Sequence, residues 1–370
     1  MNDAHPTDSH PVSDALAAAE RLRPSHPETA PPAAGGRPGQ VRAEPSAEEG
    51  AGADWVSGRT VGLIISTGVL FAVLAVQSPT FLSAYTMFVV SRQVAFYVLI
   101  ALAQAVCLVV GGMNLSVGAI GSMATVVLGL LLDRAGLPSW IAAPAAVGFG
   151  CLAGLLNGAI IVGLRIDSFI VTISMMFIYM GLRSGISGGA PYRVPDTFTR
   201  VGQGTFLGIP YVFVIMLAVL LLVSYMFRNT VFGRRLLATG GNLDAARLSG
   251  ISTDRMILSA NAMSGFFAAL AAVLWASKLG SAAPETGDDW LIVSFAVAII
   301  GGTALNGGAV SAFGILMGAS IYMLIQHGLI EVKANPYYAR SFLGALILMA
   351  IVVDRLREVY AARMEDRGAR

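Results

Sequence analysis

A glycine pair and two polar residues interrupt an apolar stretch in the first third of the chain, where Gly111-Gly112 comes shortly before Asn114 and Ser116. A side-chain amide and a hydroxyl can exchange hydrogen bonds with the hydroxyl groups of a small polar ligand. Inside a bilayer, a break in a helix is tolerated only where the backbone is buried in protein or lines a water-filled path. The segment is therefore a candidate ligand path, and the alternative is a short turn between two spans at the membrane edge.

Two further polar residues, Gln104 and Asn157, also lie within apolar stretches. Polar side chains at such positions either hydrogen-bond to neighbouring helices or face a polar path. Both residues therefore join the candidate path residues, with helix contact as the alternative role. Arg183 lies near the end of its apolar stretch, and we expect its long side chain to reach the membrane interface.

A second glycine pair, Gly301-Gly302, recurs later in the chain at the end of another apolar stretch. When the two pairs are aligned, Gly111 corresponds to Gly301 and Leu115 corresponds to Leu305. Short glycine-interrupted segments at matching places in two halves of a chain indicate a transport site. The alignment is consistent with a parallel internal repeat, and chance recurrence of a glycine turn is the alternative.

Residues 240–251 predict a short helix between two apolar stretches. Asn242 can cap its start, Asp244 places a negative charge in its first turn, and Gly250 can end it in a left-handed conformation. A helix of two turns is too short to be stable alone. It must therefore pack on its own bundle or dock into the groove of a partner.

No residue pattern in the sequence indicates catalysis, a metal site or a nucleotide site. The glycine-rich P-loop with its lysine is absent, so we do not expect this chain to hydrolyse ATP. Three of the four histidines are scattered over the first 26 residues, and the two cysteines lie in apolar stretches as expected for small buried side chains. We therefore expect a protein that is not an enzyme and that binds no metal, no cofactor and no nucleic acid.

The apolar content predicts a membrane protein. Hydrophobic residues make up 55% of the 370 residues and charged residues make up 12%, with a mean hydropathy of +0.71. Residues 93–132 contain no Asp, Glu, Lys or Arg, and this length suffices for about two bilayer spans. We predict an all-α, polytopic bundle of about ten transmembrane helices. The expected spans are 60–78, 93–111, 115–132, 140–163, 168–187, 211–228, 256–277, 291–304, 310–331 and 338–353.

The chain divides into three predicted regions, namely a disordered, acidic, proline-rich tail over 1–54, a transmembrane domain over 55–357 and a second tail over 358–370. Lysines and arginines in loops favour the cytoplasmic side of a membrane. Residues 228–255 carry five arginines, whereas residues 278–290 carry one lysine against three acidic residues. With ten spans, this charge pattern predicts that the arginine-rich segment and both termini are cytoplasmic.

Five segments, in this order, resemble the permeases of ribose-type sugar importers driven by ATP-binding-cassette ATPases. They are GGMNLSVG, LRIDSFIVT, GGNLDAARLSGI, KLGSAAPETGDDW and IIGGTALNGG, within roughly residues 60–357. The resemblance implies a permease subunit for a monosaccharide or a sugar-like polyol that forms a dimer in the bacterial inner membrane. It also implies two partners, which are a cytoplasmic ATPase that uses the ATP and a periplasmic binding protein that delivers the substrate.

The resemblance also assigns residues to roles. It places Asn114 and Ser116 near the translocation path, with the stretch from Asn157 to Thr172 beside it. It further implies that the segment around the predicted short helix is the coupling helix, which contacts the ATPase. The coupling residues are Gly240, Gly241, Asn242, Asp244, Ala245, Ala246, Arg247, Leu248, Ser249 and Gly250.

The sequence departs from the pattern of this family at charged positions. Asn114 stands where many relatives have Asp, and Leu291 and Val293 stand where acidic residues are usual. These departures bear on the substrate and not on the class of protein. The alternatives are a permease for branched-chain amino acids or nucleosides, and an ion-coupled secondary transporter, which would need acidic or histidine residues within the membrane.

Overall fold

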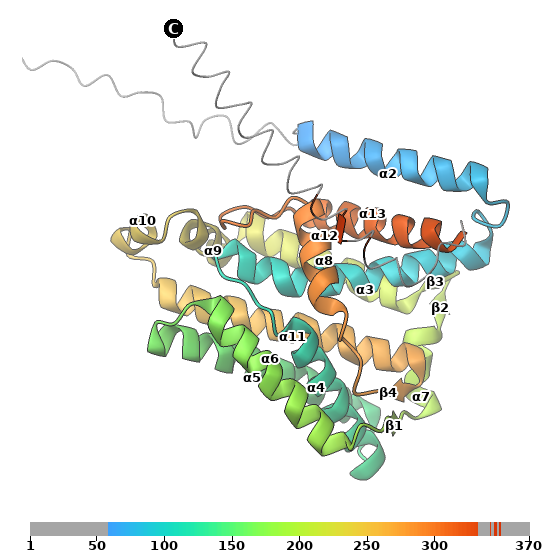
Figure 1. Cartoon of the computed structure of the whole chain (residues 1–370), viewed down its shortest axis with the longest axis horizontal. Helices are drawn as coiled ribbons and strands as arrows, with labels where there is room; N and C mark the ends of the chain where they lie inside the picture. The colour runs from blue at the N-terminus through green and yellow to red at the C-terminus, as the bar shows by residue number, and fades with distance from the viewer. Residues whose placement is uncertain (1–57, 332–340, 342–343, 346–347, 349–370) are drawn as a thin grey trace, which may run out of the picture. The chain divides into compact units, whose positions relative to one another are not determined.

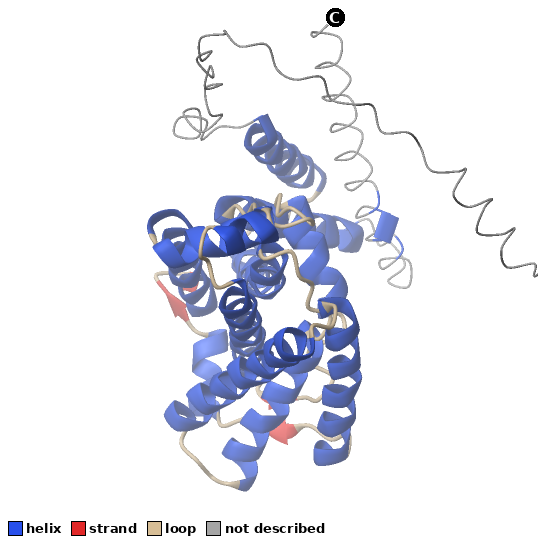
Figure 2. Ribbon diagram, turned by 90° about the vertical axis from the view of Figure 1, so that its left-hand side faces the viewer, coloured by secondary structure: helices blue, strands red, loops and turns tan. Residues whose placement is uncertain are grey.

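The computed structural model describes residues 58–331 together with residues 341, 344, 345 and 348. The longer helices of this part are α2 (Gly58–Gln77), α3 (Ala84–Val109), α4 (Val117–Gly129), α5 (Ser139–Leu164), α6 (Ser168–Ser187), α8 (Tyr211–Asn229), α11 (Thr253–Leu279) and α13 (Ala312–Glu331). The shorter ones are the π-helical turn η1 (Leu130–Arg134), α7 (Asp196–Gln203), α9 (Val231–Gly241), α10 (Leu243–Leu248) and α12 (Trp290–Ile300). Four two-residue strands, red in Figure 2, lie in the connections; they are β1 (Tyr192–Arg193), β2 (Thr205–Phe206), β3 (Ile209–Pro210) and β4 (Ser281–Ala282).

Eight helices of the described part are long and apolar enough to cross a membrane, with α4 and η1 counted as one. The predicted all-α membrane bundle is therefore confirmed, and eight of the ten expected spans have a matching helix. The expected span 291–304 is only the eleven-residue α12, which at 1.5 Å per residue is about 16 Å long, or half the roughly 30 Å hydrocarbon core. The expected span 338–353 lies outside the described residues except for four positions, and the tails 1–54 and 358–370 lie wholly outside them.

Helices α3 and α11 form the interior of the bundle. Leu99, Leu102 and the other apolar side chains of the second half of α3 are buried on all sides. Helix α11 packs against α5, α3 and α4, which surround it in Figure 1. Helix α2 lies along α13 at the edge of the bundle and leaves side chains such as Val76 exposed. Apolar side chains exposed on such helices are those expected to face lipid.

The contact between α5 and α11 depends on glycines at every fourth position of α5. A Cβ added to Gly154 would overlap the carbonyl oxygen of Asn261, and one added to Gly265 would overlap that of Gly150. Gly158 lies on the same face, where an added Cβ would be 3.1 Å from Asn261 Cβ. Small residues at this spacing let two helix backbones approach closely without a hydrophobic driving force in lipid. The glycines therefore position α11, which carries much of the core.

Two irregular connections meet at the end of α11 where the chain leaves that helix. Strand β1 pairs with β4 in antiparallel register, with Tyr192 opposite Ala282. Helix α7 is fixed to α11 because Ser277 Oγ accepts a hydrogen bond from the Gly202 amide at 2.8 Å and donates one to the Phe198 carbonyl at 2.5 Å. These bonds join the loops at residues 188–210 and 280–289 at one end of the bundle.

We predict that Gly154→Leu prevents α5 and α11 from packing, because the larger side chain must displace the Asn261 backbone. The expected loss in unfolding free energy is about 3 kcal/mol or more, measured as a lower apparent Tm of the detergent-solubilised protein. The matched control is Gly148→Leu on the same helix, since an added Cβ at Gly148 meets no atom within 4 Å. Equal Tm values for the two variants would contradict the proposed packing role.

Candidate functional site

Helix α3 ends inside the bundle, and the chain is not helical again until Val117. The amide of Gly112 donates to the carbonyl of Cys107 at 3.0 Å, and the amide of Gly111 donates to the carbonyl three residues before it at 2.9 Å. This pair of bonds is a Schellman motif, which requires a left-handed residue, and Gly111 has φ +79°. The first glycine of the pair therefore stops α3 at Val109.

The side-chain amide of Asn114 stabilises this break at both of its polar ends. Its Oδ1 accepts hydrogen bonds from the Ser116 amide at 2.9 Å and the Ser116 hydroxyl at 2.6 Å. Its Nδ2 donates to Ser264 Oγ of α11 at 2.8 Å. All three residues are fully buried. Asn114 thus provides a partner for the Ser116 amide, which an unbroken helix would have bonded within its own backbone, and for two buried hydroxyl groups.

Residues of α5 and α6 extend this network. Asn157 Nδ2 donates to Ser116 Oγ at 2.8 Å, and the Tyr179 hydroxyl donates to Asn157 Oδ1 at 3.2 Å. Thr172 Oγ1 accepts a hydrogen bond from the Leu115 amide at 3.1 Å. The break is therefore hydrogen-bonded to three helices, α5, α6 and α11.

The structure brings four of the five predicted path residues together in this network, and the fifth, Gln104, lies apart on α3. Gln104 is fully buried, and neither atom of its amide has a hydrogen-bond partner within the described residues. None of the five lines the adjoining cavity, so their part in a substrate path stays a prediction. Sequence reasoning missed two further members of the hydrogen-bonded group, Tyr179 and Ser264, although each is a polar residue within an apolar stretch. Ser168 also belongs to the group and lies in the stretch from Asn157 to Thr172 that the resemblance places beside the path.

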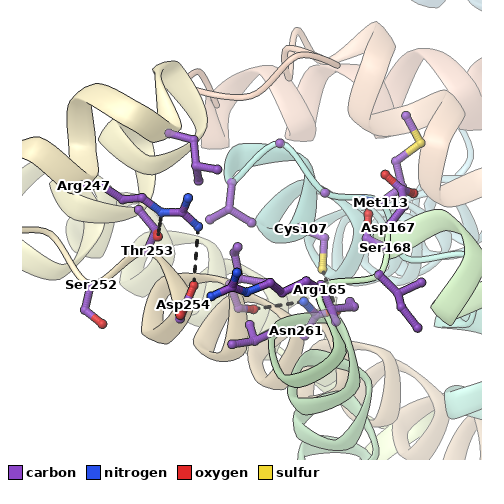
Figure 3. A pocket seen from close by; sticks show the side chains of 18 of the residues that line it. Cys107, Met113, Arg165, Asp167, Ser168, Arg247, Ser252, Thr253, Asp254 and Asn261 are labelled. Carbon is purple, nitrogen blue, oxygen red and sulfur yellow. Dashed lines mark hydrogen bonds and ion pairs between the residues drawn. The ribbon is translucent and has the colours of Figure 1, made fainter.

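A cavity of about 840 Å³ adjoins the break on the side that faces α10 (Figure 3). Its wall combines the break itself, the connection between α5 and α6, helix α10 and the first turns of α11. Both apolar groups and hydrogen-bonding groups reach it. Representative lining residues are Gly112, Met113, Arg165, Ser168, Arg247 and Asn261.

Charged residues at the edge of the cavity hold its walls in place. Arg247 Nε donates to Thr253 Oγ1 at 3.0 Å, and the Arg247 guanidinium lies 3.8 Å from the Asp254 carboxylate (Figure 3). On the opposite wall, Arg165 ends α5 with φ 53°, a left-handed conformation. Asp167 Oδ1 then accepts the Phe169 amide at 2.7 Å and caps α6. The cap and the left-handed residue let α5 turn into α6 within three residues.

The predicted short helix is α10. Asn242 caps it, because Asn242 Oδ1 accepts the Ala245 amide at 2.9 Å, and Gly250 follows it with φ +79°. Both features agree with the sequence prediction. The first two predicted coupling residues, Gly240 and Gly241, belong instead to the last turn of α9. Leu248 at the end of α10 is 90% exposed, although it is apolar.

The second glycine pair ends α12 with the same motif as the first, but in a different register. The Gly302 amide donates to the Ile299 carbonyl, and the Thr303 amide donates to the Ala298 carbonyl, both at 2.9 Å. Gly302, with φ +89°, is thus the left-handed residue that corresponds to Gly111. The alignment of Gly111 with Gly301 was therefore wrong by one residue, because the left-handed glycine is the first of one pair and the second of the other.

The connection before α12 enters the bundle. At its start, Ala282 pairs with Tyr192, whose ring packs on Gly129 of α4; near its end, Gly287 packs against Gly118 of the same helix. Gly118 and Gly129 are separated by about 16 Å of helix. Irregular backbone at membrane depth must be buried in protein or line a water-filled path. Because this connection runs into the bundle before α12 begins, α12 is only half a span long.

Arg183 fixes that connection from α6, and the expectation that it reaches the membrane interface was wrong. Its Nη1 lies 2.6 Å from the Asp288 carboxylate and donates to the Pro284 carbonyl at 2.6 Å. Its side chain is only 8% exposed. The guanidinium points into the protein because the irregular connection offers it a carboxylate and a carbonyl oxygen, both of which accept strong charge-assisted hydrogen bonds.

We predict that Asn114→Ala destabilises the protein by at least about 2 kcal/mol, because buried polar groups of Ser116 and Ser264 lose their partner. The measurement is the apparent Tm in detergent. Ser174→Ala is the control, since Ser174 is exposed and bonds only to its own helix. A Tm drop no larger than that of the control would show that the network does not stabilise the break.

Comparison with known proteins identifies the family. The sequence pattern of the family described as "Branched-chain amino acid transport system / permease component" matches residues 63–351, which lie within the predicted transmembrane domain. The fructose import permease of Rhizobium meliloti is 31% identical over 314 residues, which cover 81% of this chain and 86% of the relative. No solved structure matches the chain.

Two permeases of Escherichia coli K12 are similarly related. The ribose import permease is 30% identical over 304 residues, covering 80% of this chain and 93% of the relative. The galactose/methyl galactoside import permease is 31% identical over 315 residues, covering 80% and 94%. The family match spans more than half of the chain, and the relatives match it over nearly their whole length. The chain therefore belongs to this family of membrane-spanning permease components of transport systems.

Proposed function

We propose that the chain is the permease subunit of an ATP-driven importer for a monosaccharide or a sugar-like polyol. The names of the ribose, fructose and galactose import permeases support the substrate class. The observation that best supports coupling to a separate ATPase is the exposed end of α10. Leu248 is 90% exposed on a six-residue helix that is too short to be stable alone. A separate cytoplasmic ATPase uses the ATP and covers this helix, and the chain itself binds no cofactor.

The orientation follows from the arginines around α9 and α10. This segment faces the cytoplasm, both termini lie on the same side, and the membrane is the bacterial inner membrane. A periplasmic binding protein delivers substrate to the opposite face, and two copies of the permease form the pore. The cavity beside the break is the cytoplasmic vestibule of the path. Its volume of about 840 Å³ lies within the range of small-molecule sites.

The predicted path residues have a positioning role in this proposal. Asn114, Ser116, Asn157 and Thr172 hold the break so that Gly112 and Met113 form the wall of the vestibule. Substrate hydroxyl groups then meet the backbone and the side chains of the wall, including Ser168 and Asn261. Ser168 Oγ already accepts the Met113 amide at 3.0 Å and keeps its hydroxyl proton to donate.

Import of branched-chain amino acids is the second candidate, because the family description names that substrate class. We predict that proteoliposomes with permease, ATPase and binding protein take up a labelled monosaccharide or polyol only with ATP. An excess of unlabelled sugar should abolish this uptake, whereas leucine and nucleosides should not. Competition by leucine would favour the second candidate, and uptake by the permease alone would favour an ion-coupled transporter.

We predict that the double variant Arg247→Glu, Leu248→Asp leaves the protein inserted but abolishes binding of the ATPase and lowers uptake at least tenfold. The exposed apolar end of α10 becomes charged, so it no longer suits an apolar groove. Co-purification of the ATPase measures binding. Leu207→Asp is the control, because Leu207 is 88% exposed in the connection between β2 and β3. Normal uptake in the double variant would contradict the coupling role.

A further inference from the structure

Three backbone segments that are far apart in the sequence meet without side chains between them. The first is the end of α3 at Val109, the second is the end of α9 at Gly240, and the third is the connection between α12 and α13 at Gly307–Gly308. The carbonyl of Val109 accepts a hydrogen bond from the Gly308 amide at 2.9 Å. We call this contact the glycine junction.

Glycine is required at the centre of the junction because there is no space for a Cβ. A Cβ added to Gly240 would overlap the Val109 carbonyl oxygen and would lie 2.8 Å from the Gly308 nitrogen. A Cβ added to Gly307 would lie 2.7 Å from the Gly240 carbonyl oxygen and 2.9 Å from the Gly111 nitrogen. The three segments therefore touch through backbone atoms, which are the stiffest groups available for such a contact.

The junction connects the two parts of the proposed importer that must move together. On one side, Gly240 is three residues from the start of α10, the helix with the exposed Leu248. On the other side, Gly111 and Gly112 belong to the break and line the cavity. Close-packed interiors transmit displacement because they contain little free volume. A shift of α9 must therefore move both the end of α3 and the connection between α12 and α13, or break the contact.

We propose that the glycine junction transmits movement of α9 and α10 to the break beside the cavity. Gly240 is a positioning residue, because it holds α9 against the end of α3 and against Gly308. The inference rests on the proposed function and identifies where in this chain the partner's movement reaches the path. Three glycines at the junction, Gly111, Gly307 and Gly308, have left-handed backbone conformations, so these segments can hinge without side-chain strain. The junction opens or shifts the wall of the cavity when α10 is displaced.

The first test is Gly240→Ala in the reconstituted importer. The variant should retain ATPase binding, because the exposed face of α10 is unchanged, and should retain ATP hydrolysis. The substrate transported per ATP hydrolysed should fall at least tenfold. Gly163→Ala is the matched control, since Gly163 lies near the end of α5 and an added Cβ there meets no atom within 4 Å. A normal ratio in Gly240→Ala, with a Tm like that of the control, would overturn the proposal.

The second test needs no substitution at the junction, so it can test the transmission of movement even if Gly240→Ala does not fold. Hydrogen exchange of the wild-type complex is compared without nucleotide and trapped with ATP. Peptides covering 108–113 and 303–310 should change in protection together with the peptide covering 240–250. A change at 240–250 alone would overturn the proposal. Absence of wild-type uptake or ATPase binding would instead mean that the proposed function has failed, so the two failures are distinguishable.

Discussion

Two helices of this protein, α3 and α12, end within the bundle, and the backbone groups freed at those ends must find partners away from water. This constraint determines much of the remaining structure. After α3, the Gly308 amide donates to the Val109 carbonyl, and Thr172 and Asn114 accept the amides of Leu115 and Ser116 that precede α4. An unsatisfied group in a nonpolar surrounding costs several kcal/mol, so the helices that supply these partners cannot separate freely.

The same constraint explains why the site is arranged as it is. The break is hydrogen-bonded to α5, α6 and α11, and its Gly112 and Met113 form part of the wall of the adjoining cavity. The irregular connection before α12 is likewise held by the ion pair of Arg183 with Asp288. The long helices α5 and α11 are packed closely through Gly150, Gly154 and Gly265. The fold thus combines a stiff frame with a small number of discontinuities, and the cavity lies beside one of them.

The sequence predicted the frame well because hydropathy encodes it directly. The membrane helices, the cap at Asn242 and the stop at Gly250 depend on residues close together in the chain. Depth within the bundle is not encoded in this way, so α12 was expected to be a span and Arg183 was expected to reach the interface. The polar character of Asn114 and Ser116 was visible in the sequence. The pairing of Asn114 with Ser264 and of Ser116 with Asn157 was not, since these residues become neighbours only when α5 and α11 have packed.

The glycine pairs illustrate the limit of pattern matching. Both pairs were recognisable, but only backbone dihedral angles distinguish which member is left-handed, and that choice shifted the alignment by one residue. The contact of Gly240 with both segments also could not be predicted from a single sequence, because it joins three distant parts of the chain. The glycine turns were therefore predictable from the sequence, whereas the contact between the distant segments that carry them was not.

In the proposed importer, the exposed end of α10 is the surface that the ATPase contacts. The most direct measurement is cross-linking of a Leu248→Cys variant to the ATPase subunit in native membranes, in parallel with Leu207→Cys, which is equally exposed on a different connection. We predict a cross-link from position 248 whose yield changes when ATP is added, and none from position 207. A complex that forms and transports while position 248 remains free of cross-links would contradict this prediction.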